Sequence, residues 1–162
     1  ILCGKEIDLK IELKPAYNNE LELAEAVVEI VEEYHMEHHV IISSFHAKTI
    51  EAVHQNNKAI TTGILARFAY GSFAMDETSD VIVINSTFVS EELVQLVHAS
   101  GKRIFCWTVN SRRDVEKLTK LGIDGIITDF PVMCRETIYE ERIPSILVQL
   151  VENLITAFRE VR

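Results

Sequence analysis

Glu12 and Lys14 are the residues best suited to chemistry in this sequence, because they place a carboxylate and an ammonium two positions apart. Residues 7–15 alternate apolar and charged side chains, so the two groups share one face of a predicted strand. Pro15 ends that strand and leaves the pair at its carboxyl end, where parallel α/β folds keep reactive groups. Such a pair can hold a divalent cation beside a phosphate oxygen. The alternative is a solvated strand face with a surface ion pair.

The overall charge limits the ligands that the chain can bind. Its 162 residues include 25 Asp and Glu against 16 Lys and Arg, which gives a formal net charge of −9 at pH 7. Nucleic acids and anionic membrane surfaces both require clustered basic side chains, so the composition argues against either partner. An anionic ligand would have to be bound locally, by a few basic groups such as Lys14.

Strands alternate with helices along the rest of the sequence. After the first strand, apolar runs predict five more, at 40–45, 60–65, 81–85, 103–110 and 125–129. Apolar residues at helical spacing predict helices after Asn19 and at 46–57, 90–101 and 111–122. This alternation implies a parallel sheet with right-handed crossovers. No glycine-rich phosphate loop is present in the sequence, which favours a barrel over a nucleotide-binding fold.

Local signals also predict helix starts and buried faces. Asn19 with Glu22 resembles a capping box, while Ser90 and Ser111 are predicted to cap the third and fourth helices. The predicted core positions are Leu23, Val27, Ile30 and Tyr34 in the first helix, Ile50 and Val53 in the second, Leu93, Leu96 and Val97 in the third, and Val115, Leu118 and Leu121 in the fourth.

The cysteines and histidines support neither a disulfide framework nor a zinc site. Cys3, Cys106 and Cys134 are an odd number at wide spacings. Cys106 lies in the middle of a predicted strand, which is typical of a small core residue rather than a nucleophile. Three histidines within 35–39 could bind a metal, but no second cluster completes a site. We therefore favour an interaction of these imidazoles with the helix dipole.

Four motifs follow one another in the sequence: Ile11-Glu12-Leu13-Lys14, Ser44-Phe45, Trp107-Thr108-Val109-Asn110 and Gly122-Ile123-Asp124-Gly125-Ile126-Ile127-Thr128-Asp129-Phe130-Pro131. Each is weak alone, but their order and spacing resemble the second part of the glycerophosphodiester phosphodiesterase family. The fold of that family is a TIM barrel. The resemblance implies that the six predicted strands are strands three to eight of such a barrel, with strands one and two absent from these residues.

The same resemblance implies roles for four residues. Glu12 is similar to a metal-binding carboxylate, and Lys14 to the lysine beside the scissile phosphate. Trp107 is similar to the aromatic residue that lines the substrate pocket, and Phe45 is expected to join it. In the family, the first strand carries a His-Arg pair and the second a Glu-x-Asp pair followed by a further His, which supply proton transfer and most metal ligands. The resemblance implies that neither strand lies within these residues. The metal would be calcium or magnesium, because hard oxygen ligands suit both.

Two functions are compatible with this resemblance. The first is a metal-dependent hydrolase that cleaves glycerophosphodiesters to glycerol 3-phosphate and an alcohol, with this chain as its carboxyl-terminal part and inactive alone. The second is a non-catalytic binding or oligomerisation module derived from the same barrel. Retention of Glu12, Lys14 and Trp107 together favours the hydrolase. The sequence does not begin with Met, which indicates a piece of a larger protein. A membrane domain there is possible, and the location is left open between cytoplasmic and membrane-associated.

The predicted domain boundary falls near residue 135. Residues 1–135 are expected to form the partial barrel and residues 136–162 an amphipathic helix. From Pro144 onward, apolar residues recur at Leu147, Leu150, Val151, Leu154, Ile155 and Phe158. Two absent strands would leave unpaired sheet edges. We therefore expect this helix to pack on the barrel or on a partner, and we expect a homodimer.

Overall fold

A computed structural model describes residues 8–67 and 78–141 of the chain. Within these residues lie the strands β1 (Leu9–Leu13), β2 (Val40–Ser44), β3 (Thr61–Ala66), β4 (Val81–Asn85), β5 (Arg103–Trp107) and β6 (Gly125–Ile126). Every neighbouring pair is parallel, and the strand order in the sheet follows the sequence. The predicted parallel β/α fold with six strands is confirmed.

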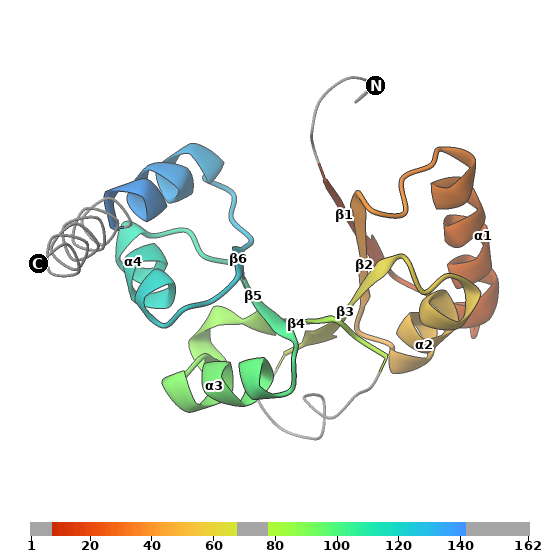
Figure 1. Ribbon diagram of the computed structural model, residues 1–162, viewed down its shortest axis with the longest axis horizontal. Coiled ribbons are helices and arrows are strands. Elements are labelled where there is room, and N and C mark those ends of the chain that lie inside the picture. The colour runs from red at the N-terminus through yellow and green to blue at the C-terminus, as the bar shows by residue number, and fades with distance from the viewer. Residues whose placement is uncertain (1–7, 68–77, 142–162) are drawn as a thin grey trace, which may run out of the picture.

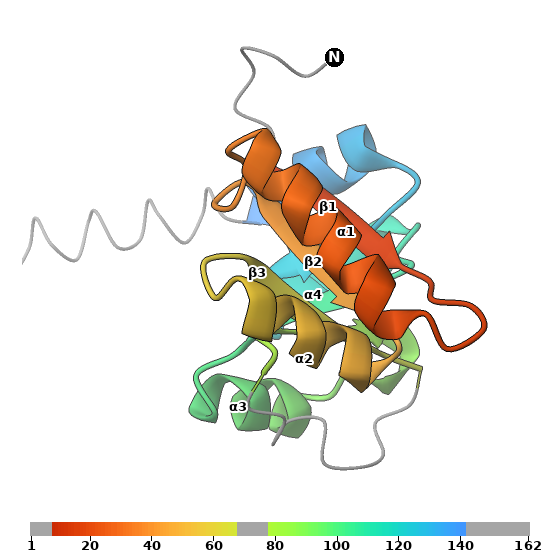
Figure 2. The ribbon, with the colours of Figure 1, turned by 90° about the vertical axis from the view of Figure 1, so that its right-hand side faces the viewer.

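The helices lie on one side of this sheet. They are α1 (Glu20–Glu33), α2 (Ala47–Asn56), α3 (Glu91–Ala99), α4 (Arg112–Lys120), the 3-10 helix η2 (Ser86–Phe88) and a helix over residues 131–141. The sheet curves into an open arc with the helices on its convex side, as half of a barrel would (Figure 1). Helices α1 and α2 lie side by side across the strands β1 to β3 (Figure 2).

Strand β4 shows why the centre of the sheet is apolar on both faces. Ile82 and Ile84 are fully buried under the helices, in the largest core cluster of the described residues. Val81 and Val83 point the other way and are also fully buried, beneath the aromatic side chains of the concave face. Because alternate side chains enter two different cores, the strand reads as a continuous hydrophobic run.

Two predicted caps are confirmed. The Ser90 hydroxyl accepts a hydrogen bond from the Leu93 amide at 3.2 Å, and the Ser111 hydroxyl accepts one from the Asp114 amide at 3.2 Å. Each cap satisfies an amide that has no partner inside its helix. The predicted capping box at Asn19 is wrong. The Asn19 side chain instead accepts a hydrogen bond from the Ala16 amide at 2.7 Å and closes the preceding loop.

The buried faces of α1 and α3 differ in part from the prediction. The fully buried side chains of α1 are Ala24, Val28 and Val31, whereas Leu23 and Val27 are half-buried and Ile30 and Tyr34 are exposed. In α3, Val94 and Val97 are buried and Leu96 is 53% exposed. Helix α1 is apolar around much of its circumference, so several faces fit the helical period, and the predicted core face was the one with the larger side chains. In the structure, α1 packs closely against the sheet and α2, and the face that it buries there carries the smaller side chains of Ala24, Val28 and Val31. The predicted core positions of α2 are confirmed, as are Val115 and Leu118 of α4, whereas Leu121, which follows α4, is half-buried against the same cluster.

The helix over residues 131–141 closes the described part of the chain against α4. Arg112 forms an ion pair with Glu140 at 2.9 Å, and Lys120 forms one with Glu141 at 3.2 Å. Cys134 of this helix is buried in the main core cluster. The predicted apolar stripe from Leu147 onward lies outside the described residues.

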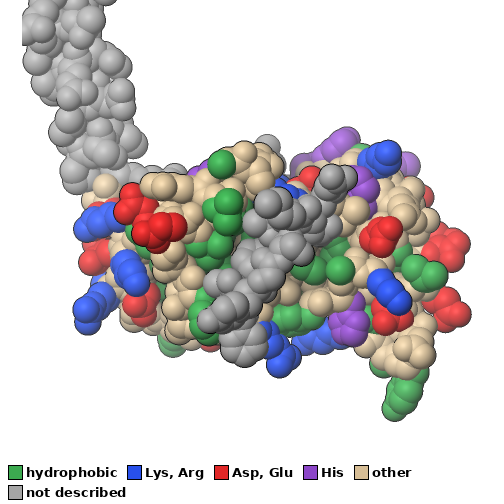
Figure 3. Space-filling model, turned by 90° about the horizontal axis from the view of Figure 1, so that it is seen from below, with side chains coloured by type: hydrophobic (Ala, Val, Ile, Leu, Met, Phe, Trp, Pro, Cys, Tyr) green, Lys and Arg blue, Asp and Glu red, His purple; other side chains and the backbone are tan. Residues whose placement is uncertain are grey.

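The surface of the described residues carries charges of both signs. Lysine, arginine and acidic side chains are interspersed over the face shown in Figure 3. Among the described helices, none has the length and apolar character that crossing a bilayer would require.

Candidate active site

Glu12 and Lys14 lie together at the carboxyl end of β1. The Lys14 ammonium is 3.7 Å from the Glu12 carboxylate, and the side chains are 78% and 32% exposed. The structure therefore brings together the two charged residues that the alternation pattern placed on one strand face. Because both side chains are exposed, both charged groups are available to a ligand. An exposed ion pair of this kind also contributes little to stability.

Two buried serines hold the backbone on either side of Glu12. The Ser43 hydroxyl donates a hydrogen bond to the Ile11 carbonyl at 3.2 Å, and the Ser44 hydroxyl donates one to the Leu13 carbonyl at 2.9 Å. Both serines are fully buried, so these bonds lie away from competing water. They add side-chain bonds to the β1–β2 ladder at the position of the carboxylate.

Lys10 also lies on the face of β1 that carries the candidate pair, two residues before Glu12. Burial lowers the pKa of the Lys10 ammonium, although the nearby Glu12 carboxylate raises it and Lys14 lowers it again. The carboxylate is thus flanked along the strand by two ammonium groups. The alternation placed Lys10 on this face, but it did not show that burial would lower the pKa of the Lys10 ammonium.

Phe45 and Trp107 form an edge-to-face aromatic pair. Their ring centroids are 6.1 Å apart, and the ring planes make an angle of 86°. Phe45 follows β2 and Trp107 ends β5, so three strand spacings of about 4.8 Å would separate them by roughly 14 Å in a flat sheet. The curvature of the sheet brings the two rings into contact across its concave face. The Trp107 indole N–H donates to the Val83 carbonyl at 3.2 Å, which fixes the ring.

A polar network joins the ends of two quoted motifs, although the sequence assigned its residues no role. The Asn110 amide donates to the Asp129 carboxylate at 2.8 Å, and its carbonyl accepts from the Thr128 hydroxyl at 3.1 Å and the Asp129 amide at 3.0 Å. This network joins the loops after β5 and β6. The strand β6 ends at Ile126 rather than at the predicted residue 129, and the Asp129 amide donates to the Asn110 side chain instead of to a neighbouring strand. The residues of the network stand at the ends of two of the quoted motifs, 107–110 and 122–131, but the motifs alone did not show that these residues meet.

The described residues supply one carboxylate, that of Glu12, at the carboxyl end of β1. Among residues 8–67 and 78–141, no group of three or more His, Cys, Asp and Glu side chains could hold a metal ion. The histidines near the end of α1 accordingly form no metal cluster there, and His39 pairs with Asp8 at 3.0 Å. Glu12 fits a hard cation such as calcium or magnesium as one oxygen ligand of several.

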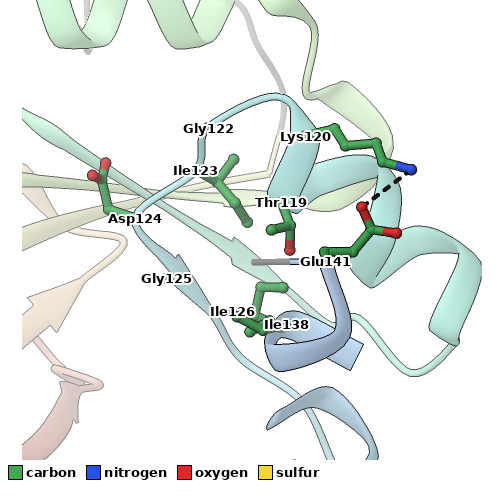
Figure 4. Close-up of a pocket in the computed structure, with 9 residues that line it drawn as sticks. All are labelled: Thr119, Lys120, Gly122, Ile123, Asp124, Gly125, Ile126, Ile138 and Glu141. Carbon is green, nitrogen blue, oxygen red and sulfur yellow. Dashed lines mark ion pairs between the residues drawn. The ribbon is translucent and has the colours of Figure 1, made fainter. Parts of the chain in front are cut away.

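A separate cavity of about 530 Å³ lies between α4, β6 and the helix over residues 131–141 (Figure 4). The ion pair of Lys120 and Glu141 spans one side of it, and Ile123, Ile126 and Ile138 form its apolar part. It adjoins the turn that precedes β6, at the amino end of that strand. The candidate site lies at the opposite, carboxyl ends of the strands, where β/α barrels carry their chemistry.

Cys106 is a core residue, as the sequence predicted. It is fully buried, and burial together with the Asp124 carboxylate raises the pKa of its thiol to about 12. Because only the thiolate reacts, we expect alkylation of native Cys106 at pH 8 to be at least about 100-fold slower than in the urea-unfolded chain. Iodoacetamide labelling with mass spectrometry of the Cys106 peptide measures both rates. Equal rates in the two states would show that the thiol is accessible.

The curved parallel sheet, with its helices outside and its charged and aromatic groups at the strand ends, defines a protein of the TIM-barrel type. Comparisons with known proteins specify this class further. The model of the glycerophosphoryl diester phosphodiesterase family matches residues 3–133. The chain belongs to this family, and the resemblance read from its motifs is confirmed.

The relatives extend well beyond the matched part. The glycerophosphodiester phosphodiesterase of Caldanaerobacter subterraneus subsp. tengcongensis is 28% identical over 134 residues, covering 81% of this chain and 55% of that protein. The one from Bacillus altitudinis is 29% identical over 140 residues, covering 76% of this chain and 52% of that protein. The chain therefore spans about half the length of these relatives.

The fold similarity is of the same extent. The structure of an Oleispira antarctica phosphodiesterase, in complex with the product sn-glycerol-3-phosphate, matches this chain with a TM-score of 0.73 at 21% identity. The match covers 82% of this chain and 56% of that one. The described fold thus corresponds to a little over half of that chain.

Proposed function

We propose that this chain is the carboxyl-terminal part of a metal-dependent phosphodiesterase that hydrolyses glycerophosphodiesters to glycerol 3-phosphate and an alcohol. Its six strands would be strands three to eight of the barrel. The observation that carries the proposal is the pair of Glu12 and Lys14, 3.7 Å apart on the same sheet edge as Phe45 and Trp107. The family membership and the glycerophosphodiester phosphodiesterases among the relatives support it.

Each group at this edge has a distinct task in the proposed reaction. The Lys14 ammonium binds a phosphate oxygen and offsets the charge that grows on it as the diester is attacked. The Phe45 and Trp107 rings cover the apolar faces of the substrate and exclude water. Glu12 would hold a calcium or magnesium ion, which, when bound, polarises the phosphodiester. Proton transfer would come from groups outside the described residues.

We expect the isolated 162-residue chain to hydrolyse glycerophosphodiesters negligibly. The two strands that carry the His-Arg pair and the Glu-x-Asp pair of the family are not among its six strands, so it would hold only part of the electrostatic machinery. Release of glycerol 3-phosphate, measured by an enzyme-coupled assay with calcium or magnesium, checks this expectation. The control is the same polypeptide extended upstream of Ile1.

The two assays together decide between the candidate functions. Hydrolysis by the extended polypeptide alone supports the proposed division of the active site. Turnover by the isolated chain at the rate of the extended one would contradict the expected inactivity. No hydrolysis by either polypeptide would favour the alternative, a non-catalytic binding or oligomerisation module.

A further inference from the structure

Arg67 places a positive charge next to the aromatic pair of the candidate site. It follows the last residue of β3, on the concave face that it shares with Leu65 by alternation. Its guanidinium carbon lies 5.0 Å from the centroid of the Phe45 ring, which also forms the edge-to-face pair with Trp107. A guanidinium and two aromatic rings therefore stand in a row along the carboxyl edge of the sheet.

This arrangement changes what the aromatic pair can bind. Two rings at right angles attract a quaternary ammonium group through their π faces. Here the guanidinium of Arg67 already lies over the Phe45 ring, so a second cation would be repelled. None of the ion pairs among the described residues involves Arg67, and its side chain is exposed. Its charge is therefore available to a ligand.

The position of Arg67 indicates which part of a substrate it would contact. Strand β3 is two positions from β1 in the sheet, so its end lies roughly 10 Å from that of β1, where Lys14 would bind the phosphate. The Arg67 guanidinium itself lies over the Phe45 ring, which with Trp107 would cover the substrate beyond the phosphate, so the guanidinium suits a group esterified to the phosphate. The glycerol half is the same in every glycerophosphodiester, so only the alcohol half can vary in charge.

We propose that Arg67 selects the alcohol of the substrate by charge, favouring glycerophosphodiesters whose alcohol carries a negative group over those with a cationic alcohol such as choline. This inference rests on the proposed function. An anionic group on the alcohol would form charge-assisted hydrogen bonds with the guanidinium in a partly exposed site. The quaternary ammonium group of choline would be repelled by the Arg67 guanidinium at the place where two aromatic rings alone would attract it.

The test compares the hydrolysis of three substrates by the polypeptide extended upstream of Ile1. These are glycerophosphocholine, glycerophosphoglycerol and bis(glycerophospho)glycerol, whose leaving alcohols are cationic, neutral and anionic. We expect kcat/KM to favour the anionic over the cationic alcohol by about tenfold, and Arg67→Gln to reduce this ratio to near unity. Arg67→Lys keeps the charge and should retain part of the preference.

Arg103 provides a matched control. Its guanidinium carbon lies 5.8 Å from the Phe105 ring, but it begins β5 and so lies at the amino end of the strands. Arg103→Gln should therefore leave the substrate ratio unchanged. A wild-type ratio near unity, a ratio that Arg67→Gln leaves intact, or an equal loss of activity on all three substrates would overturn the inference. In each of these cases the proposed hydrolase would stand.

Direct binding separates this inference from the proposed function. Trp107 is the only tryptophan of the sequence, so its fluorescence in the 162-residue chain reports occupation of the aromatic pair. If the extended polypeptide hydrolyses none of the substrates, the proposed function fails. Tighter quenching by bis(glycerophospho)glycerol than by glycerophosphocholine, lost in Arg67→Gln, would still support charge selection. Equal quenching in both variants would overturn it.

Discussion

Glu12→Gln in the polypeptide extended upstream of Ile1 is expected to lower kcat/KM for glycerophosphodiesters on the order of 10²- to 10³-fold. Glutamine keeps the shape of the side chain but removes the negative charge that a hard cation requires. The midpoint of the metal titration of activity should move to a concentration about 10- to 100-fold higher. Calcium and magnesium titrations of the initial rate measure both effects.

Lys14→Ala is the matched control for this substitution. It removes the neighbour of Glu12 at 3.7 Å, so it breaks the same ion pair without removing the carboxylate. Activity should fall, but the metal midpoint should stay near that of the wild type, because the proposed function assigns Lys14 to the phosphate rather than to the metal. Identical metal titrations for wild type and Glu12→Gln would refute the metal assignment. Because the pair is exposed, its loss should change the free energy of unfolding by less than about 1 kcal/mol.

Ile84→Ala should lower the free energy of unfolding of the chain by about 2–5 kcal/mol. The Ile84 side chain is fully buried in β4, at the centre of the sheet and under the helices. The substitution removes apolar contacts and leaves a cavity that the surrounding strands cannot fill. Urea unfolding monitored by circular dichroism measures the effect as a lower transition midpoint.

Leu96→Ala is the control for this prediction. Leu96 belongs to the helical pattern of α3 but is 53% exposed, so its truncation should cost at most a few tenths of the Ile84→Ala effect. A comparable loss for both variants would mean that α3 packs with the face that periodicity alone had selected. The pair of substitutions therefore tests the fold at a position where sequence and structure disagree.

The sequence alone determined the features that depend on local geometry. Alternation along β1 placed Glu12 and Lys14 on one face, and Pro15 placed them at the strand end, because side-chain direction in a strand has a fixed period of two. Ser90 and Ser111 were recognised as caps because a cap involves residues only three positions apart. The family motifs could likewise be recognised from the sequence, because each is a short segment and the four follow one another in a fixed order.

Only the tertiary structure decided which distant groups meet. The contact between Phe45 and Trp107 depends on the curvature of the sheet, which no local period records. The pairing of β2 with β3 places Arg67 over Phe45, and the loops after β5 and β6 meet through Asn110 and Asp129. The buried face of α1 was decided by close packing, because a helix that is apolar on several sides has no single preferred stripe until its neighbours are in place.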